Sequence, residues 1–207
     1  MFPALPRVTR TLIIVNVAVF FAQFVMGRWL VATFALWPLS LAGQYGLPGV
    51  GNFQIWQVVT YAFLHGSMAH LLFNMFALFM FGGEIERVWG ERRYLIYYFA
   101  CVIGAALAQL VVTSASSAPP YPTLGASGGV FGLLLAFGMM FPRRIIMLIF
   151  PPIPMPAWLF VTLYGAIELV LGVTGTQAGV AHFAHLGGMA AGYVLIQYWR
   201  GRGPFRR

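Results

Sequence analysis

Four polar residues within apolar stretches of the chain could carry out acyl-transfer chemistry: Ser127, His185, His70 and Asn74. A serine hydroxyl becomes a strong nucleophile when a base removes its proton, and histidine titrates near neutral pH. Acyl transfer also develops an oxyanion that needs fixed donors. His70, Asn74 and the backbone N–H of Ser127 at a helix N-terminus could supply them. Because the chain contains no Asp, these residues predict a Ser127–His185 dyad and not a Ser–His–Asp triad.

Each of these residues also has a purely structural interpretation. The run from Gly125 to Gly129 is typical of close packing between membrane helices. It also matches the G-x-S-x-G elbow of α/β-hydrolases, but that fold needs a soluble sheet. His185 alone could be a packing residue, and the pair His70 and Asn74 could bond to a neighbouring helix. The catalytic hypothesis therefore depends on the four residues lying together.

The composition indicates which solvent surrounds the chain. Of its 207 residues, 60% are hydrophobic and only 8% are charged, whereas soluble domains are about 25% charged. The whole chain is therefore interpreted as one membrane domain, residues 1–207. The net charge of +8 comes from arginines that lie between apolar runs, where topology signals belong, so nucleic-acid binding is excluded. The single cysteine, Cys101, excludes a disulfide framework and a cysteine metal site.

The apolar runs predict an all-α polytopic membrane protein, since a helix needs about 20 apolar residues to cross a bilayer. Six spans are expected, near residues 11–27, 68–86, 93–113, 126–141, 157–174 and 181–199. With six spans, every arginine except Arg28 falls on one side, so the positive-inside rule favours cytoplasmic N- and C-termini. The first run lacks a small-residue cleavage site and is expected to be a retained span, not a signal peptide. Trp29–Phe63, broken by Pro and Gly, then becomes a partly embedded extracytoplasmic loop.

This topology predicts that the four candidate residues share one depth. The second, fourth and sixth spans all run from outside to inside, and each candidate lies near the start of its span. At a rise of about 1.5 Å per residue, they should form one shallow layer below the outer surface. The small-residue faces Gly128-x3-Gly132 and Gly188-x3-Gly192 are expected to let the fourth and sixth spans approach closely, which would bring Ser127 and His185 within hydrogen-bond reach.

Other polar residues have weaker interpretations. His182 shares a helix face with His185, and interfacial packing is the favoured interpretation. A metal site of histidines is disfavoured because the chain has no H-E-x-x-H and no carboxylate close by in sequence, so we expect neither metal nor cofactor. Glu168, near the outer end of the fifth span, could pair with His182, face a wet cavity or help that span move. Glu86 and Arg87, beside Glu91 and Arg92, are interpreted as an ion-paired cytoplasmic helix end.

In order along the chain, four motifs resemble the rhomboid family of intramembrane serine proteases: His65-x4-His70-Leu-Leu-Phe-Asn74, Gly82-Gly83-Glu-Ile-Glu86-x3-Gly90, Gly125-Ala-Ser127-Gly and Ala184-His185-x2-Gly188-x3-Gly192. The resemblance runs from Trp56 to Gly192. It implies Ser127 as nucleophile, His185 as general base, and His70 and Asn74 as oxyanion donors. It also implies that the first loop is a half-embedded hairpin. Trp56-Gln57 stands where many members have Trp-Arg, a departure that concerns the first loop and not the dyad.

The resemblance implies a single-span transmembrane substrate, cut near its extracytoplasmic end after entry beside the fifth span. A bacterial plasma (inner) membrane is the expected location, because no transit peptide is evident. Two alternatives stay open: a channel or transporter with a polar solute site, and a non-catalytic membrane-protein binder of the same fold. Against the first, the sequence has no inverted repeat and no array of charges along a path. Labelling by a fluorophosphonate serine probe would separate both from a protease.

Overall fold

The computed structural model describes residues 4–39, 52–115, 121–148, 152–175 and 180–201, and this part of the chain is mostly helical. Seven α-helices follow one another with two short helical turns and two strands between them. Their bounds are α1 (Arg7–Phe34), α2 (Gln57–Thr60), the 3-10 turn η1 (Tyr61–Phe63), α3 (Met68–Ala77), the π-helical turn η2 (Leu78–Gly82), α4 (Gly83–Ser114), α5 (Ser127–Met140), β1 (Ile145–Met147), β2 (Pro154–Pro156), α6 (Ala157–Thr174) and α7 (His182–Trp199).

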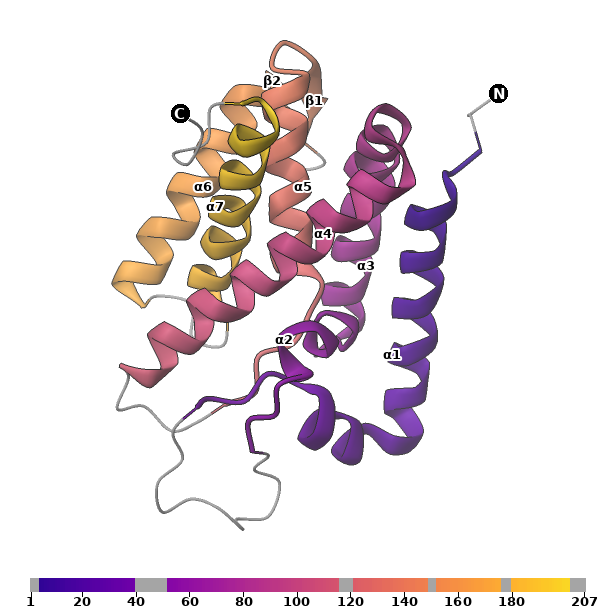
Figure 1. Cartoon of the computed structure of the whole chain (residues 1–207), viewed down its shortest axis with the longest axis vertical. Helices are drawn as coiled ribbons and strands as arrows, with labels where there is room; N and C mark the ends of the chain where they lie inside the picture. Colours follow the sequence, from indigo (N-terminus) through magenta and orange to yellow (C-terminus); the bar gives the residue numbers. More distant parts are fainter. Residues whose placement is uncertain (1–3, 40–51, 116–120, 149–151, 176–179, 202–207) are drawn as a thin grey trace.

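Two of the long helices are interrupted. α1 breaks at Met26 (φ −121°, ψ 23°), and α4 breaks at Gly90 (φ 74°, ψ 165°). A positive φ of this kind is readily adopted only by glycine. α3 and the first part of α4 run in one direction, and the long remainder of α4 runs back in the other (Figure 1). The stretch Met68–Ser114 therefore contains two helices of opposite direction.

The outer surface of the bundle is suited to lipid. Within the described residues, three helical stretches are long and apolar enough to cross a membrane: Arg7–Phe34, Met68–Ser114 and Ala157–Thr174. Large apolar side chains on their outward faces are exposed, including Phe24, Val25, Leu72 and Val173. Water would penalise such a surface, whereas lipid does not. The chain is an integral membrane protein, as the composition predicts.

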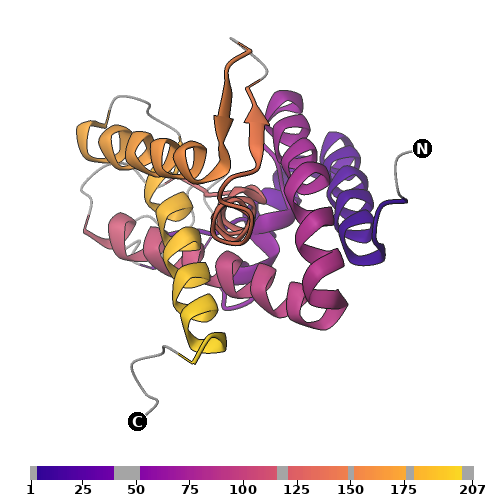
Figure 2. The same ribbon diagram turned by 90° about the horizontal axis from the view of Figure 1, so that it is seen from above.

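α5 occupies the centre of the bundle. Seen from above in Figure 2, it is viewed end-on with α3, α4, α6 and α7 arranged around it. Its sequence is apolar on every side, as expected of a buried helix, and most of its residues are buried. Fourteen residues extend about 21 Å, which is shorter than the roughly 30 Å hydrocarbon core. Gly125 and Ala126, which lead into α5, are both buried, so this short helix begins inside the bundle and not at its surface.

The first loop is more helical than predicted, because α1 continues to Phe34 and α2 and η1 lie at the loop's end. Its glycines at 43, 46, 49 and 51, together with Tyr45 and Pro48, lie outside the described residues. The remainder is joined by the buried side chain of Gln57. Its Oε1 accepts from the backbone N–H of Trp37 at 3.2 Å, and its Nε2 donates to the carbonyls of Thr33 (3.1 Å) and Asn52 (3.0 Å). The residue that departs from the Trp-Arg pattern is thus part of the loop's internal packing.

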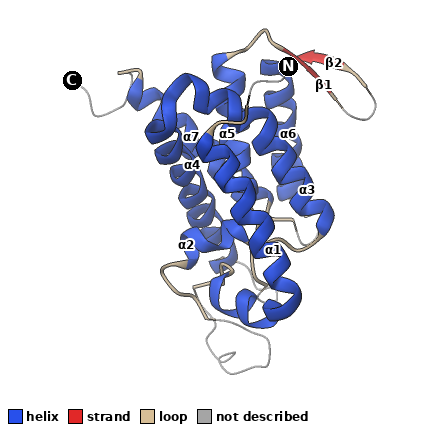
Figure 3. Cartoon of the chain, turned by 90° about the vertical axis from the view of Figure 1, so that its right-hand side faces the viewer, coloured by secondary structure: helices blue, strands red, loops and turns tan. Residues whose placement is uncertain are grey.

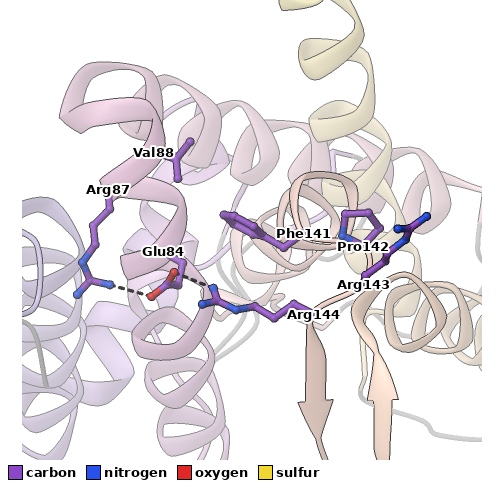
Figure 4. Close-up of a pocket in the computed structure, with 7 residues that line it drawn as sticks. All are labelled: Glu84, Arg87, Val88, Phe141, Pro142, Arg143 and Arg144. Carbon is purple, nitrogen blue, oxygen red and sulfur yellow. Dashed lines mark hydrogen bonds and ion pairs between the residues drawn. The ribbon is translucent and has the colours of Figure 1, made fainter.

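At the opposite end of the molecule the start of α1, the start of α4 and the segment after α5 meet. Glu84 accepts hydrogen bonds from Arg87 at 3.0 Å and from Arg144 at 2.9 Å (Figure 4), and Arg87 also donates to the Ala4 carbonyl. An open pocket of about 520 Å³ lies here, lined by Glu84, Arg87, Val88, Phe141, Pro142, Arg143 and Arg144. The short β1–β2 hairpin projects from the same end (Figure 3).

Glu86 is not part of that ion-paired group, so the sequence interpretation of Glu86 is wrong. Its carboxylate accepts from the backbone N–H groups of Val8 (2.9 Å) and Thr9 (2.7 Å), and from the Thr9 hydroxyl (2.7 Å). The first N–H groups of a helix have no partner within the helix, and a carboxylate there also complements the helix dipole. Glu86 therefore caps α1 from the neighbouring helix, a contact between residues far apart in sequence.

Candidate functional site

Ser127 is the first residue of α5 and is presented from inside the bundle. The preceding Gly125 adopts φ +125°, and its N–H donates to the Tyr61 carbonyl at 2.9 Å. Two further backbone hydrogen bonds of 2.9 Å pair Thr123 with Leu36. Through these contacts the first loop and η1 position the segment that leads into α5. As the first residue of the helix, Ser127 also has a backbone N–H without an intrahelical acceptor.

His185, on the first turn of α7, lies against Ser127. Its Nε2 is 2.9 Å from the Ser127 Oγ. The close approach of the two helices explains this contact, because a Cβ added to Gly188 would overlap the backbone carbonyl of Gly128. The predicted contact between the two small-residue faces is confirmed at this pair. Farther along, Gly132 and Gly192 both pack against Cys101 of α4, so the third helix of the junction fills the space there.

The ring of His185 is held on one face by Phe131. The two rings are parallel within 5°, with centroids 4.3 Å apart. Phe131 lies one helical turn after Ser127, so both side chains project from the same face of α5. Stacking of this kind restricts rotation of the imidazole about its own axis. The serine and the restraint on its histidine partner are therefore supplied by one helix.

The other ring nitrogen of His185 meets a carboxylate. Its Nδ1 is 2.8 Å from Oε2 of Glu168 on α6, and Nδ1 of His182 is 2.7 Å from the same oxygen. All three side chains are buried. An ionised carboxylate only accepts hydrogen bonds, so both histidines donate through Nδ1–H. The Nε2 of neutral His185 is then the acceptor for the Ser127 hydroxyl.

The sequence left three interpretations of Glu168 open, and the structure selects the pairing with His182 while adding His185. The favoured interpretation of His182, packing alone, is incomplete because its ring also donates to Glu168. Oxygen–nitrogen distances of 2.7 and 2.8 Å are those of charge-assisted hydrogen bonds. Two ligands of a tetrahedral zinc, at about 2.0–2.1 Å from the ion, would lie more than 3 Å apart. The distances therefore favour a proton between these atoms.

His70 and Asn74 lie on α3 beside the entrance to α5. The His70 ring packs against Gly125, where a Cβ would come within 2.7 Å of its Nε2. Asn74 is buried, and its Nδ2 donates to the His70 carbonyl at 3.0 Å. Ser67 caps α3 by accepting from the His70 N–H at 3.1 Å. The structure thus brings His70 to the glycine two residues before Ser127, and Asn74 one turn farther along the same helix.

Known proteins that are similar to this chain include several members of one family. The family model described as the Rhomboid domain matches residues 52–202, well over half of the chain. The chain belongs to the rhomboid family. Its match to the Rhomboid protease AarA of Providencia stuartii is 32% identical over 212 residues and covers 92% of this chain and 73% of that protein. The family predicted from the four motifs is thereby confirmed.

Other rhomboid relatives match over shorter stretches. The Putative rhomboid protease YdcA of Bacillus subtilis is 34% identical over 113 residues, which is 54% of each protein. The Rhomboid protease GluP of the same organism is 40% identical over 79 residues, 38% of this chain and 14% of that protein. The chain therefore spans about half, or much less, of the length of these two relatives.

Two features of this rhomboid site were not predicted from the sequence. The stacking of Phe131 on His185 had a usable signal, since Phe131 is four residues after Ser127 and must share its helix face. The contact between Glu168 and His185 had a weaker one. Glu168 is the single acidic residue of a long apolar run, but its direction depends on how α6 is rotated, and a helix that is apolar all round does not fix that rotation.

Proposed function

We propose that this rhomboid protein is an intramembrane serine endopeptidase in which Ser127 is the nucleophile and His185 the general base. The observation that carries the proposal is the 2.9 Å contact between Ser127 Oγ and His185 Nε2 inside an apolar bundle. Nucleophile and base within hydrogen-bond reach are the geometric signature of acyl transfer. The relatives named as rhomboid proteases support the same activity.

The reaction follows from the atoms in contact. Ser127 Oγ attacks the carbonyl carbon of the scissile peptide bond and gives its proton to His185 Nε2. That proton then passes to the departing amine nitrogen, the C–N bond breaks, and the acyl group stays on Ser127. A water molecule next attacks the ester carbonyl and loses a proton to the same Nε2. When the ester bond breaks, the proton returns to Ser127 Oγ and the carboxylic acid product leaves and ionises in water.

The oxyanion formed in each half of the reaction needs donors that are already in place. The backbone N–H of Ser127 at the start of α5 is one, and the helix dipole favours negative charge there. His70 and Asn74 are the proposed side-chain donors. The Asn74 amide has two hydrogens, and its bond to the His70 carbonyl occupies one of them. The proposal assigns the other hydrogen to the oxyanion.

The proposed substrate is a single-span transmembrane protein cut near its extracytoplasmic end. A helical substrate hides its carbonyls in i→i−4 bonds, and lipid offers no replacement partner. Local unwinding must therefore precede attack, which favours weak helix formers and a small residue at the cut. We further propose six membrane spans: α1, the two halves of Met68–Ser114, α5, α6 and α7. Both termini are cytoplasmic, in a bacterial plasma membrane.

The test is cleavage of a single-span reporter by the purified protein in liposomes, beside Ser127→Ala and His185→Ala. The matched control is Ser114→Ala, a serine at the end of α4 whose hydroxyl, within the described part of the chain, donates to the Leu110 carbonyl of its own helix. The parent and the control are expected to cut, and the two site variants are expected to be inactive. A fluorophosphonate probe should label the parent and the control but not Ser127→Ala. Cleavage by Ser127→Ala at the parental rate would overturn the proposal, as would a parent that neither cuts nor labels.

A further inference from the structure

The buried carboxylate of Glu168 lies behind the proposed dyad and has no role in a two-residue mechanism. It is the one acidic residue in the apolar run that forms α6. Along residues 162–174 of this helix, all of which the structure describes, Glu168 is the sole buried residue. An ionisable side chain inside a membrane bundle is costly, and its presence there indicates a function.

We propose that Glu168 is the positioning residue for His185, so that three helices supply a Ser127–His185–Glu168 relay. The inference rests on the proposed protease function and deepens it. Glu168 Oε2 accepts from His185 Nδ1 at 2.8 Å, and Ser127 Oγ lies 2.9 Å from Nε2 of the same ring. The carboxylate thus occupies the place that an aspartate takes in Ser–His–Asp sites, although it comes from a different helix than either partner.

The carboxylate does two things for the base. First, it selects the tautomer: an N–H at Nδ1 leaves Nε2 with a lone pair that can take the Ser127 proton. Second, the negative charge stabilises the imidazolium that forms when the proton moves, and this attraction is strong where water is scarce. Phe131 is stacked on the ring face and Glu168 is bonded at the ring edge. Together they hold the imidazole in one orientation.

His182 has a separate part in holding the carboxylate. Its Nδ1 donates to the same Oε2 at 2.7 Å, so the oxygen is fixed from two sides. One turn beyond Glu168, Gly172 allows close approach of α6 to α7, because a Cβ there would lie 3.2 Å from the Cβ of His182. The position of the outer half of α6 therefore determines whether the carboxylate reaches His185.

The test compares kcat and KM of Glu168→Gln and Glu168→Leu with those of the parent in liposomes, and includes Ser127→Ala. Glutamine keeps the size and one acceptor oxygen of the side chain but loses its charge. Leucine loses the charge and the acceptor oxygens. We expect kcat to fall in the order parent, Gln, Leu, with a loss of about 100-fold or more for Leu and with KM within about twofold. His182→Leu should lower kcat less than Glu168→Leu does, because the carboxylate loses one of its two donors but keeps its contact with His185.

A second readout follows the tautomer directly and needs no substrate. Nitrogen-15 NMR of histidine-labelled protein should show His185 protonated at Nδ1 in the parent and shifted towards the Nε2–H form in Glu168→Leu. His185→Asn identifies the signals by their loss. The proposal is overturned if the tautomer is unchanged in Glu168→Leu, or if both Glu168 variants keep kcat within twofold while Ser127→Ala is inactive. If Ser127→Ala cuts like the parent, the protease function fails instead, and the NMR result still decides the Glu168 contact.

Discussion

Gly188 of α7 lies directly against Gly128 of α5, so closely that a Cβ at position 188 would overlap the Gly128 carbonyl. Gly128 is the residue after Ser127, and Gly188 is three residues after His185, which is a little less than one helical turn. The distance between the proposed nucleophile and its base is therefore set by two residues that carry no chemistry. Side chains at the junction would act as a spacer between the helices.

Gly188→Ala is expected to separate α5 from α7 and to lengthen the contact between Ser127 and His185. Overpacking of this kind costs about 1–3 kcal/mol, and the obstacle here is backbone, which cannot rotate away. Fluorophosphonate labelling of Ser127 should slow by at least about tenfold, since proton transfer to the base needs direct contact. Labelling rate and thermal unfolding in detergent would measure both effects.

The matched control for that variant is Gly165→Ala on α6. A Cβ there would have only the flexible end of Met189 within reach, at 3.4 Å. Alanine is also a better helix former than glycine by about 1 kcal/mol, so this variant should be as stable as the parent or more so. Labelling of Gly188→Ala at the parental rate would contradict the role given to the glycine contact.

Glu86→Gln should destabilise the fold while leaving the proposed dyad intact. The carboxylate accepts from two backbone N–H groups and one hydroxyl at the start of α1. An amide has one acceptor oxygen and a donor that faces other donors, so at least one bond is lost. Capping and charge–dipole effects together suggest that the free energy of unfolding falls by about 1–3 kcal/mol. The measurement is the unfolding temperature, which should be lower than that of the parent.

Glu91→Gln serves as its control. Glu91 also belongs to α4 but is exposed, and its substitution removes the same negative charge. Its unfolding temperature should match that of the parent. Equal unfolding temperatures for Glu86→Gln and Glu91→Gln would show that the contact with α1 contributes nothing.

Gln57→Leu is expected to loosen the first loop. The substitution removes three hydrogen bonds and leaves the Trp37 N–H and the carbonyls of Thr33 and Asn52 without this partner. A buried polar group without a partner costs about 1–3 kcal/mol. Limited proteolysis from the loop side should accelerate severalfold. The exposed Gln54→Leu should not change the rate, and equal rates for the two variants would contradict the bonding role of Gln57.

Contacts that follow from a repeating pattern could be predicted from the sequence, and contacts that depend on helix rotation could not. The small-residue spacing at Gly128 and Gly188 indicated a close approach because membrane helices pack through such faces. Glu168 was different, since an apolar run gives no preferred face, and three interpretations stayed open: pairing with His182, facing a wet cavity, or helping the fifth span move. Glu86 was misread because its polar neighbours in sequence suggested ion pairs, whereas its partners are 77 and 78 positions away. A cap supplied by another helix leaves no local pattern.

His65 predicts a pH-dependent stability. It is almost fully buried in the turn before α3, both ring nitrogens lack a hydrogen-bond partner in the described structure, and its ring contacts His70. Burial, followed by the nearby His70, lowers the pKa of His65 from 6.5 to about 4. Above about pH 6.5 the histidine is neutral in the folded and the unfolded chain. Between about 6.5 and 4 the unfolded chain binds the proton and the folded chain does not, so stability falls as the pH falls.

The measurement is the unfolding temperature in detergent at pH values from 7.5 to 4, for the parent and His65→Gln. One proton changes the free energy of unfolding by at most about 1.4 kcal/mol per pH unit. Below about pH 6.5 the variant should lose this part of the pH dependence. Glutamine keeps a polar side chain of similar length but cannot bind the proton. The backbone of residue 65 also bonds to the Gln23 side chain. Its N–H donates to Gln23 Oε1 at 3.0 Å, and its carbonyl accepts from Gln23 Nε2 at 3.2 Å. These two bonds do not involve the ring, so the substitution should keep them. Parallel curves for the two proteins would mean that His65 is not the group that titrates.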